Sequence, residues 1–160
     1  MKGTIAKQIR QTHPFSSPEQ EAMLGLRMAA ARMLAPWERF LKTTADLSVS
    51  QYNVLRILRG SHPAGLTCGQ ILERTIARDP DVTRLVDRLV KRGLVKRTRS
   101  ETDRRVVVVD ITRKGLDLLR ELDPHALKMP RALLGHVSRT RLRQLAKLVA
   151  EVLDGMGTYP

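Results

Sequence analysis

The sequence predicts a mainly α-helical fold that carries one small β-hairpin. Most of the chain places apolar residues three and four positions apart, which is the repeat of an amphipathic helix. Residues 94–111 depart from this repeat, because β-forming and basic residues mix over 94–99 and four consecutive valines occupy 106–109. The letters Ser-Glu-Thr-Asp between these runs are typical of a turn. We therefore expect two paired strands in an otherwise helical chain.

The first long helix is expected to begin after Ser17, where Ser-Pro-Glu-Gln forms a capping box with proline at the first helical position. Its apolar residues form a heptad-like seam. The seam consists of Met23, Leu26, Ala30, Met33, Trp37 and Phe40. Pro36 is expected to kink or break this helix near Met33, because proline lacks the N–H group and crowds the preceding turn. The seam exceeds what one small domain needs, so we expect part of it to meet another subunit.

Two further capping boxes begin at Ser48 and Thr67, and each predicts a helix. A longer helix is expected over residues 82–92, with Asp79-Pro80 as its start signal and Gly93 as its stop. Its apolar stripe, which we expect to be buried, consists of Val82, Leu85, Val86, Leu89 and Val90. Its other face is charged and must look outward. A short helix, a connection and a longer basic helix are the order of a helix-turn-helix.

The C-terminal part is expected to be helical as well. Thr112 can cap a helix, Asp123-Pro124 predicts a bend and restart, and Pro130 predicts a second irregularity. Ser138 then caps a final helix with another apolar seam. This seam consists of Leu142, Leu145, Val149, Val152 and Met156. Two apolar terminal helices that flank a central unit indicate association across a two-fold axis, so we expect a homodimer.

Composition and charge favour a polyanionic partner. The 160 residues carry a formal net charge of +13 at pH 7, and Lys and Arg side chains neutralise phosphate groups. Only 3% of the residues are aromatic, whereas proteins that grip single strands stack bases on aromatic rings. Double-stranded DNA is therefore the expected partner.

Several other classes of protein are not expected. The sequence offers no glycine-rich phosphate loop, paired carboxylates or nucleophile motif that would indicate an enzyme. The four histidines lack metal-ligand spacing and Cys68 is the single cysteine, so we expect no metal site, no cofactor and a reducing cytoplasm. No apolar run is long enough to predict a membrane span.

Three motifs follow one another closely in the central part of the chain. They are VTRLVDRLVKRGLV (82–95), DRR (103–105) and ITRKG (111–115). In this order they resemble the winged helix-turn-helix of the MarR family of bacterial transcription regulators, and the strong part of the resemblance spans residues 47 to 122. The resemblance implies a dimer formed by the first and last helices.

The resemblance divides the chain into three segments of one intertwined structural domain. Residues 1–46 would be an N-terminal arm and dimerisation helix, residues 47–112 the winged helix-turn-helix, and residues 113–160 the C-terminal dimerisation helices. A two-fold dimer presents two recognition helices about 34 Å apart on DNA. The function implied is therefore sequence-specific transcriptional regulation at a pseudo-palindromic operator.

The resemblance also implies the residues that contact DNA. In the recognition helix they are Asp79, Asp81, Thr83, Arg84 and Arg88, and in the wing they are Arg99, Asp103, Arg104 and Arg105. Arginine can bond bidentately to a guanine edge, so Arg84 and Arg88 are expected to contact guanine or phosphate. Asp81 could accept from cytosine, hold a neighbouring arginine or help the cap. Arg105 is expected at the minor groove or backbone, with Asp103 orienting the arginines of the tip.

Members of this family commonly lose DNA affinity when they bind small aromatic acids or phenols, so the resemblance implies a repressor released by such a ligand. A ligand pocket that touches Met33 or Trp37 is one interpretation of the apolar stripe, and plain core or dimer packing is the preferred one. A non-specific, nucleoid-type basic protein is the alternative function, and it explains the charge but not the caps and ordered motifs. Sequence preference separates the two, because a repressor should favour its site by roughly 10³-fold or more.

Overall fold

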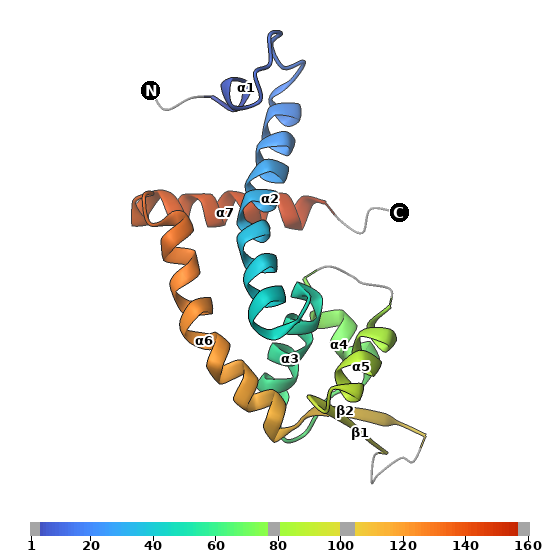
Figure 1. The fold of residues 1–160 in the computed structure, drawn as a ribbon. Coiled ribbons are helices and arrows are strands. Elements are labelled where there is room, and N and C mark those ends of the chain that lie inside the picture. The colour runs from blue at the N-terminus through green and yellow to red at the C-terminus, as the bar shows by residue number, and fades with distance from the viewer. Residues whose placement is uncertain (1–3, 77–80, 100–104, 157–160) are drawn as a thin grey trace. The chain divides into compact units, whose positions relative to one another are not determined.

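The computed structural model describes residues 4–76, 81–99 and 105–156. In chain order its elements are the helices α1 (Ile5–Gln8), α2 (Pro18–Ala45), α3 (Val49–Ser61), α4 (Cys68–Arg74) and α5 (Val82–Lys91), the strands β1 (Val95–Arg99) and β2 (Val107–Ile111), and the helices α6 (Arg113–Leu134) and α7 (Arg139–Gly155) (Figure 1). The expectation of a mainly helical fold with one β-hairpin is confirmed. The chain forms two compact units, Met1–Leu119 and Arg120–Pro160.

Helix α3 is the centre of the first unit. It contacts α2, α4, α5 and β2, and its side chains Val54, Leu55 and Leu58 are fully buried. Val86 and Leu89 of α5 are fully buried too. Because amphipathic helices pack through their apolar stripes, α3 serves as the common support of the helices around it.

Helix α5 buries most of its predicted apolar stripe. The buried members are Val82, Leu85, Val86 and Leu89. Val90 is 37% exposed and so lies at the margin of the stripe, which corrects the expectation that the whole stripe is buried. Gly93 follows the helix with a φ of +69°, so the predicted glycine stop is confirmed. The predicted start signal at Asp79 and Pro80 falls outside the described residues.

The predicted capping boxes differ in outcome. Those that begin α3 and α4 are reciprocal, and they pair Ser48 with Gln51 and Thr67 with Gln70. The box predicted at α2 is only half formed. The Ser17 hydroxyl accepts from the backbone N of Gln20 at 3.3 Å, but the Gln20 amide oxygen accepts from the backbone N and hydroxyl of Ser16 instead. Ser16 offers both a backbone N–H and a hydroxyl as donors, and it takes the place of the backbone N–H of Ser17 as the partner of the Gln20 side chain.

Three prolines lie inside helices that continue past them. Helix α2 contains Pro36, and α6 contains Pro124 and Pro130. The expected break near Met33 and the expected restart at residue 124 are therefore wrong, whereas the alternative kink at Pro36 stays a prediction. All three prolines are exposed, so water can solvate the carbonyl groups that lose their helical partner.

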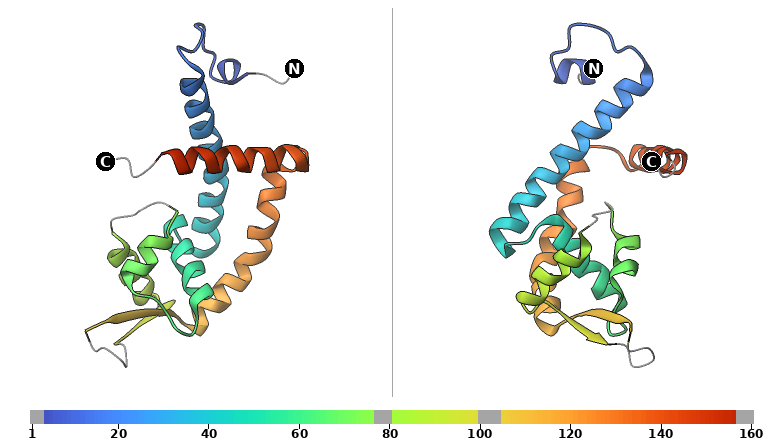
Figure 2. Two further views of the ribbon diagram at one scale, coloured as in Figure 1. Left: turned by 180° about the vertical axis from the view of Figure 1, so that it is seen from behind. Right: turned by 90° about the vertical axis from the view of Figure 1, so that its right-hand side faces the viewer.

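Strands β1 and β2 form an antiparallel hairpin. Their register runs from Val95 opposite Ile111 to Arg99 opposite Val107. Val95 and Ile111, at the base of the hairpin, are buried, whereas Arg99 and Val107 are exposed. The hairpin is therefore rooted in the core of the first unit, and Figure 2 shows both strands projecting from its helices.

Both long terminal helices keep apolar side chains exposed. In α2 these are Met23, Leu26, Met33 and Leu34, and in and just after α7 they are Leu145, Leu148, Val152, Leu153 and Met156. The whole of α7 is described, and none of its residues is buried. Apolar surface of this kind is available for contact with another chain.

Candidate nucleic-acid interface

The outer face of α5 presents polar and cationic side chains. Thr83, Arg84 and Arg88 are exposed, and Asp81 precedes the first helical residue. The Asp81 carboxylate lies 3.2 Å from Nη1 of Arg84, whose side chain is 79% exposed. An acidic residue thus orients an arginine that remains open to solvent. The structure brings together four of the five residues predicted for this helix, and the fifth, Asp79, lies outside the described residues.

Strand β1 is tied to α5 by an arginine. Nη1 of Arg97 lies 2.6 Å from Oδ1 of Asp87, and its Nη2 donates to the backbone oxygen of Thr83 at 3.4 Å. Spacing along the chain did not indicate this contact, because the two side chains lie on different elements. The pair holds the hairpin at a fixed place beside the outer face of α5.

The described part of the hairpin carries two of the four predicted wing residues. Arg99 is exposed at the end of β1, and Arg105 is exposed shortly before β2 begins. Asp103 and Arg104 lie outside the described residues. The two described arginines flank the predicted tip, so both belong to the projecting end of the hairpin.

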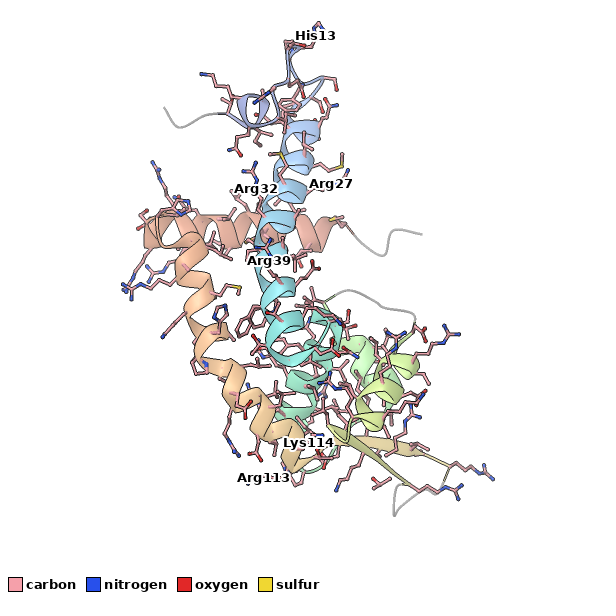
Figure 3. All side chains as sticks on the ribbon, viewed as in Figure 1. His13, Arg27, Arg32, Arg39, Arg113 and Lys114 are labelled. Atoms are coloured by element: carbon pink, nitrogen blue, oxygen red, sulfur yellow. The ribbon has the colours of Figure 1, made fainter. Side chains whose placement is uncertain are left out.

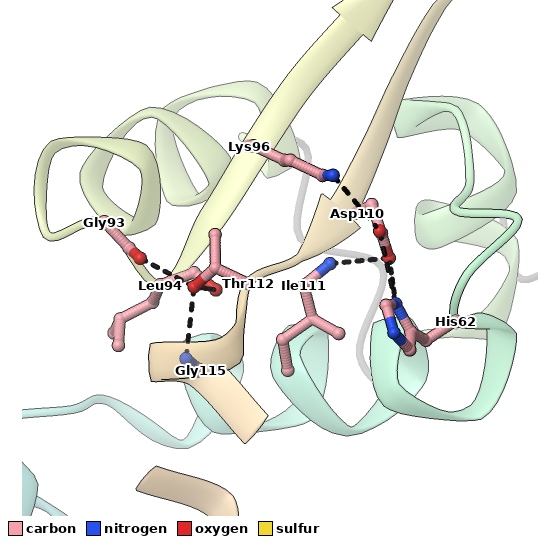
Figure 4. Close-up of polar contacts among 8 residues, drawn as sticks. All are labelled: His62, Gly93, Leu94, Lys96, Asp110, Ile111, Thr112 and Gly115. Atoms are coloured by element: carbon pink, nitrogen blue, oxygen red, sulfur yellow. Dashed lines mark hydrogen bonds and ion pairs between the residues drawn. The ribbon is translucent and has the colours of Figure 1, made fainter. Parts of the chain in front are cut away.

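The base of the hairpin is fixed by Thr112, which lies between β2 and α6 (Figure 4). Its hydroxyl donates to the backbone oxygen of Gly93 at 2.7 Å and accepts from the backbone N of Gly115 at 3.2 Å. The predicted cap of α6 is thereby confirmed. A Cβ on Gly115 would lie 2.3 Å from the backbone oxygen of Leu94, so only glycine allows α6 to start this close to the hairpin.

The C-terminal end of α5 is fastened to α2. The Arg92 guanidinium donates to the backbone oxygens of Ala45 and Asp46, both at 2.7 Å, and Lys114 (Figure 3) donates to the backbone oxygen of Arg92 at 2.9 Å. Cations are favourable at the carbonyl end of a helix. A hydrogen bond and the positive charge of Lys42 lower the pKa of Asp46, with a smaller effect from Arg92. The α5 helix is therefore held at both its buried face and its end.

The candidate ligand-pocket residues have different surroundings. The Trp37 ring stacks on Phe40 with centroids 5.5 Å apart and meets Tyr52 of α3 edge-on at 4.9 Å. Met33 is 37% exposed. Sequence reasoning missed Tyr52, although its place three positions before the inward Leu55 was a signal. Trp37 thus takes part in aromatic packing between α2 and α3, and a ligand pocket stays a prediction.

Two kinds of feature are absent from the described ranges 4–76, 81–99 and 105–156. No group of three or more His, Cys, Asp or Glu side chains there could hold a metal ion. No helix there combines the length and the apolar character needed to cross a membrane.

Residues 45–106, which contain α3, α4, α5 and β1 and end just before β2, match the model of the MarR family. A MarR transcription factor of known structure from Planctomyces limnophilus is 42% identical, with a TM-score of 0.64, and the alignment covers 86% of this chain and 98% of that protein. The chain belongs to the MarR family. This MarR-family protein is a DNA-binding transcriptional regulator.

Further relatives agree with this assignment. The transcriptional regulator YfiV of Bacillus subtilis is 35% identical over 74% of this chain and 73% of YfiV. The transcriptional repressor MprA of Escherichia coli is 34% identical over 58% of this chain, but the match spans only 49% of MprA. The structure of Bordetella bronchiseptica BpsR, whose DNA binding is regulated by 6-hydroxynicotinic acid, is 25% identical with a TM-score of 0.75 over 89% of this chain and 99% of BpsR.

Proposed function

We propose that this MarR-family protein binds a pseudo-palindromic operator in double-stranded DNA as a homodimer and represses transcription until a small ligand releases it. The single observation that carries the DNA-binding part is the geometry of α5. Most of its apolar stripe is buried inside the first unit, and its opposite face exposes Thr83, Arg84 and Arg88. Arg97 holds the hairpin beside that face. A helix so mounted fits the major groove, while the hairpin reaches the adjacent backbone or minor groove.

Each candidate contact has a distinct role in this proposal. Arg84 and Arg88 read guanine edges or grip phosphate, and Thr83 touches a base or phosphate. Asp81 orients Arg84 through their 3.2 Å ion pair. In the wing, Arg99 and Arg105 bind the phosphate backbone or the minor groove. Asp79, Asp103 and Arg104 complete the proposed set.

The homodimer follows from the terminal helices. The segments 1–46 and 113–160 carry the exposed apolar side chains of α2 and α7, and both would serve dimerisation around the DNA-binding segment 47–112. A two-fold pair of α5 helices would then meet successive major grooves about 34 Å apart. Sedimentation of the purified chain should show a dimer, and a monomer at micromolar concentration would contradict this part.

Binding rather than catalysis is the proposed activity, and the cytoplasm its site. The relatives are transcriptional regulators, and the sequence offers no catalytic motif. The deciding experiment measures binding to the protein's own promoter region and to a scrambled duplex of equal length across a salt series. A preference of roughly 10³-fold or more supports the operator-binding repressor. Equal and steeply salt-dependent affinities would replace it with the nucleoid-type alternative.

Ligand release is tested separately. BpsR is regulated by an aromatic acid, and aromatic acids and phenols therefore make up the first panel. At least one compound should weaken operator binding fivefold or more, a typical size for such coupling. In Met33→Ala the response should be smaller than in Leu34→Ala, because both residues are exposed on α2 and only Met33 belongs to the proposed pocket. Unaltered operator affinity across the panel would remove ligand release from the proposal.

A further inference from the structure

Strand β2 is held by the connection that leads from α3 into α4. The backbones of Leu66 and Val109 exchange two hydrogen bonds of 2.9 and 2.8 Å. Gly65 has a φ of +69° and passes so close to the strand that a Cβ would lie 2.7 Å from the backbone oxygen of Val109. This connection therefore lies against the hairpin like a short third strand.

Beside this bridge, Asp110 joins three parts of the first unit (Figure 4). Its two carboxylate oxygens lie 3.0 and 3.2 Å from Nδ1 of His62, which follows the last residue of α3. One of these oxygens also accepts from the backbone N of Ile111 at 2.8 Å. Lys96, opposite Asp110 on β1, places Nζ 4.0 Å from the other oxygen. The Asp110 side chain is only 7% exposed, whereas that of His62 is 39% exposed.

A buried carboxylate is unfavourable unless its partners offset the lost hydration. The partners of Asp110 come from the end of α3, from β1 and from its own strand, so they satisfy the charge only when these elements keep their places. Asp110 is too deeply buried to meet DNA, while Arg99 and Arg105 of the same hairpin are exposed. Any effect of Asp110 on DNA binding must therefore act through other residues.

We propose that Asp110 and His62 are positioning residues for DNA binding. Their contact sets the angle of the hairpin against the connection to α4, and so the place at which Arg99 and Arg105 meet the phosphate backbone. The inference rests on the proposed function, because it requires the wing arginines to contact DNA. It extends that function to two residues that do not touch DNA.

The loss of the Asp110 charge alone would change DNA affinity in the opposite direction from the loss of positioning. Replacing Asp110 by a neutral residue removes a negative charge from a DNA-binding unit, and phosphate attraction should then tighten binding. Loss of positioning should weaken binding to the operator. Asp117→Asn provides the electrostatic baseline, because Asp117 is a partly exposed aspartate on α6 that pairs with Arg113.

The experiment compares operator affinities of the full chain. Asp110→Ala and His62→Ala should each weaken operator binding about tenfold, as expected for a hydrogen bond to a charged group. The double variant should bind the operator about as weakly as the single variant with the lower affinity, because both changes remove the same contact. His62→Asn offers an amide N–H donor near the place of Nδ1 and should restore most of the affinity. Affinity for Asp110→Ala equal to or above that of Asp117→Asn would overturn the proposal.

Amide hydrogen exchange gives a readout without DNA. In His62→Ala the amides of Leu66 and Val109 should exchange about tenfold faster, since their mutual bonds depend on the place of β2. The amide of Leu58 in α3 should exchange as in the wild type. Equal acceleration of all three would indicate general destabilisation and overturn positioning. If the wild type shows no operator preference, the proposed function fails, whereas exchange still decides whether the contact holds the hairpin.

Discussion

Arg97 of β1 places its guanidinium 2.6 Å from the carboxylate of Asp87 on α5. The same guanidinium donates to the backbone oxygen of Thr83, one turn earlier on that helix. The proposed recognition helix α5 and the proposed wing are thus joined directly and not only through the core. The proposed DNA contacts of α5 and of the hairpin would therefore keep fixed positions relative to one another.

Arg97→Gln should weaken operator binding roughly tenfold, since the hairpin loses its link to α5. The free energy of unfolding should fall by at most about 1 kcal/mol, because ion pairs this exposed contribute little. Operator titration and urea unfolding measure the two effects. Arg113→Gln is the matched control, because it also removes one positive charge and one partly exposed ion pair, with Asp117. Equal losses of affinity in both variants would attribute the effect to charge alone.

Arg84→Ala and Arg105→Ala should differ in the kind of loss. Arg84 projects from α5, so its removal should cost about 1–3 kcal/mol at particular base pairs and relax the preference there. Arg105 lies at the wing, so its removal should weaken binding more evenly across sequences and reduce the salt dependence. Binding to a panel of single-base operator variants separates the two patterns. An equal loss on all sequences for Arg84→Ala would remove it from the base-reading residues.

Gly115→Ala should destabilise the protein by about 1–3 kcal/mol, the usual cost of overpacking. The new methyl group would lie 2.3 Å from the backbone oxygen of Leu94 and 2.7 Å from a carbon of Ile111. Gly69→Ala in α4 is the control, because its Cβ would meet nothing closer than 3.8 Å and alanine favours a helix by up to about 1 kcal/mol. The urea concentration at the midpoint of unfolding should fall for Gly115→Ala and rise for Gly69→Ala. A stable Gly115→Ala would mean that α6 can shift from the hairpin at little cost.

Local patterns predicted the parts of the fold that depend on neighbouring residues. The reciprocal caps at Ser48 and Thr67 and the left-handed Gly93 each depend on residues within a few positions, and all three are confirmed. Pro36 shows the limit of such patterns. The sequence gives the cost of an internal proline, but whether water can reach the freed carbonyl depends on exposure, which only the folded chain determines.

The candidate site likewise has one part that local patterns predicted and another that they did not. The outward face of α5 could be predicted from helical period, and the structure places Thr83, Arg84 and Arg88 there. The contacts that hold this face in place, Arg97 with Asp87 and Arg92 with the end of α2, join elements distant in sequence. Periodicity within one element carries no information about them. The DNA contacts themselves and the three-segment division of the chain stay predictions.

The end of α2 offers a test of the electrostatics around α5. Asp46 has a φ of +48° and ends α2, where Lys42 donates a hydrogen bond to its carboxylate. This bond and the charge of Lys42 lower the pKa of Asp46 below its ordinary value of 3.8, and Arg92 contributes less. Lys42→Met should therefore raise this pKa toward 3.8, and Arg92→Gln should raise it by a smaller amount.

The sign of the linked stability follows from the lowered pKa. A carboxyl group whose pKa is lower in the folded state stabilises that state at pH values above its unfolded pKa, and the stabilisation disappears as the pH falls through the folded pKa. The wild type should keep this contribution at neutral pH and lose it only below about pH 4, while Lys42→Met should lack it throughout. Carboxyl carbon chemical shifts measured against pH give the Asp46 midpoint in each variant. A midpoint that stays unchanged in Lys42→Met would show that the backbone around Asp46, and not Lys42, controls its charge.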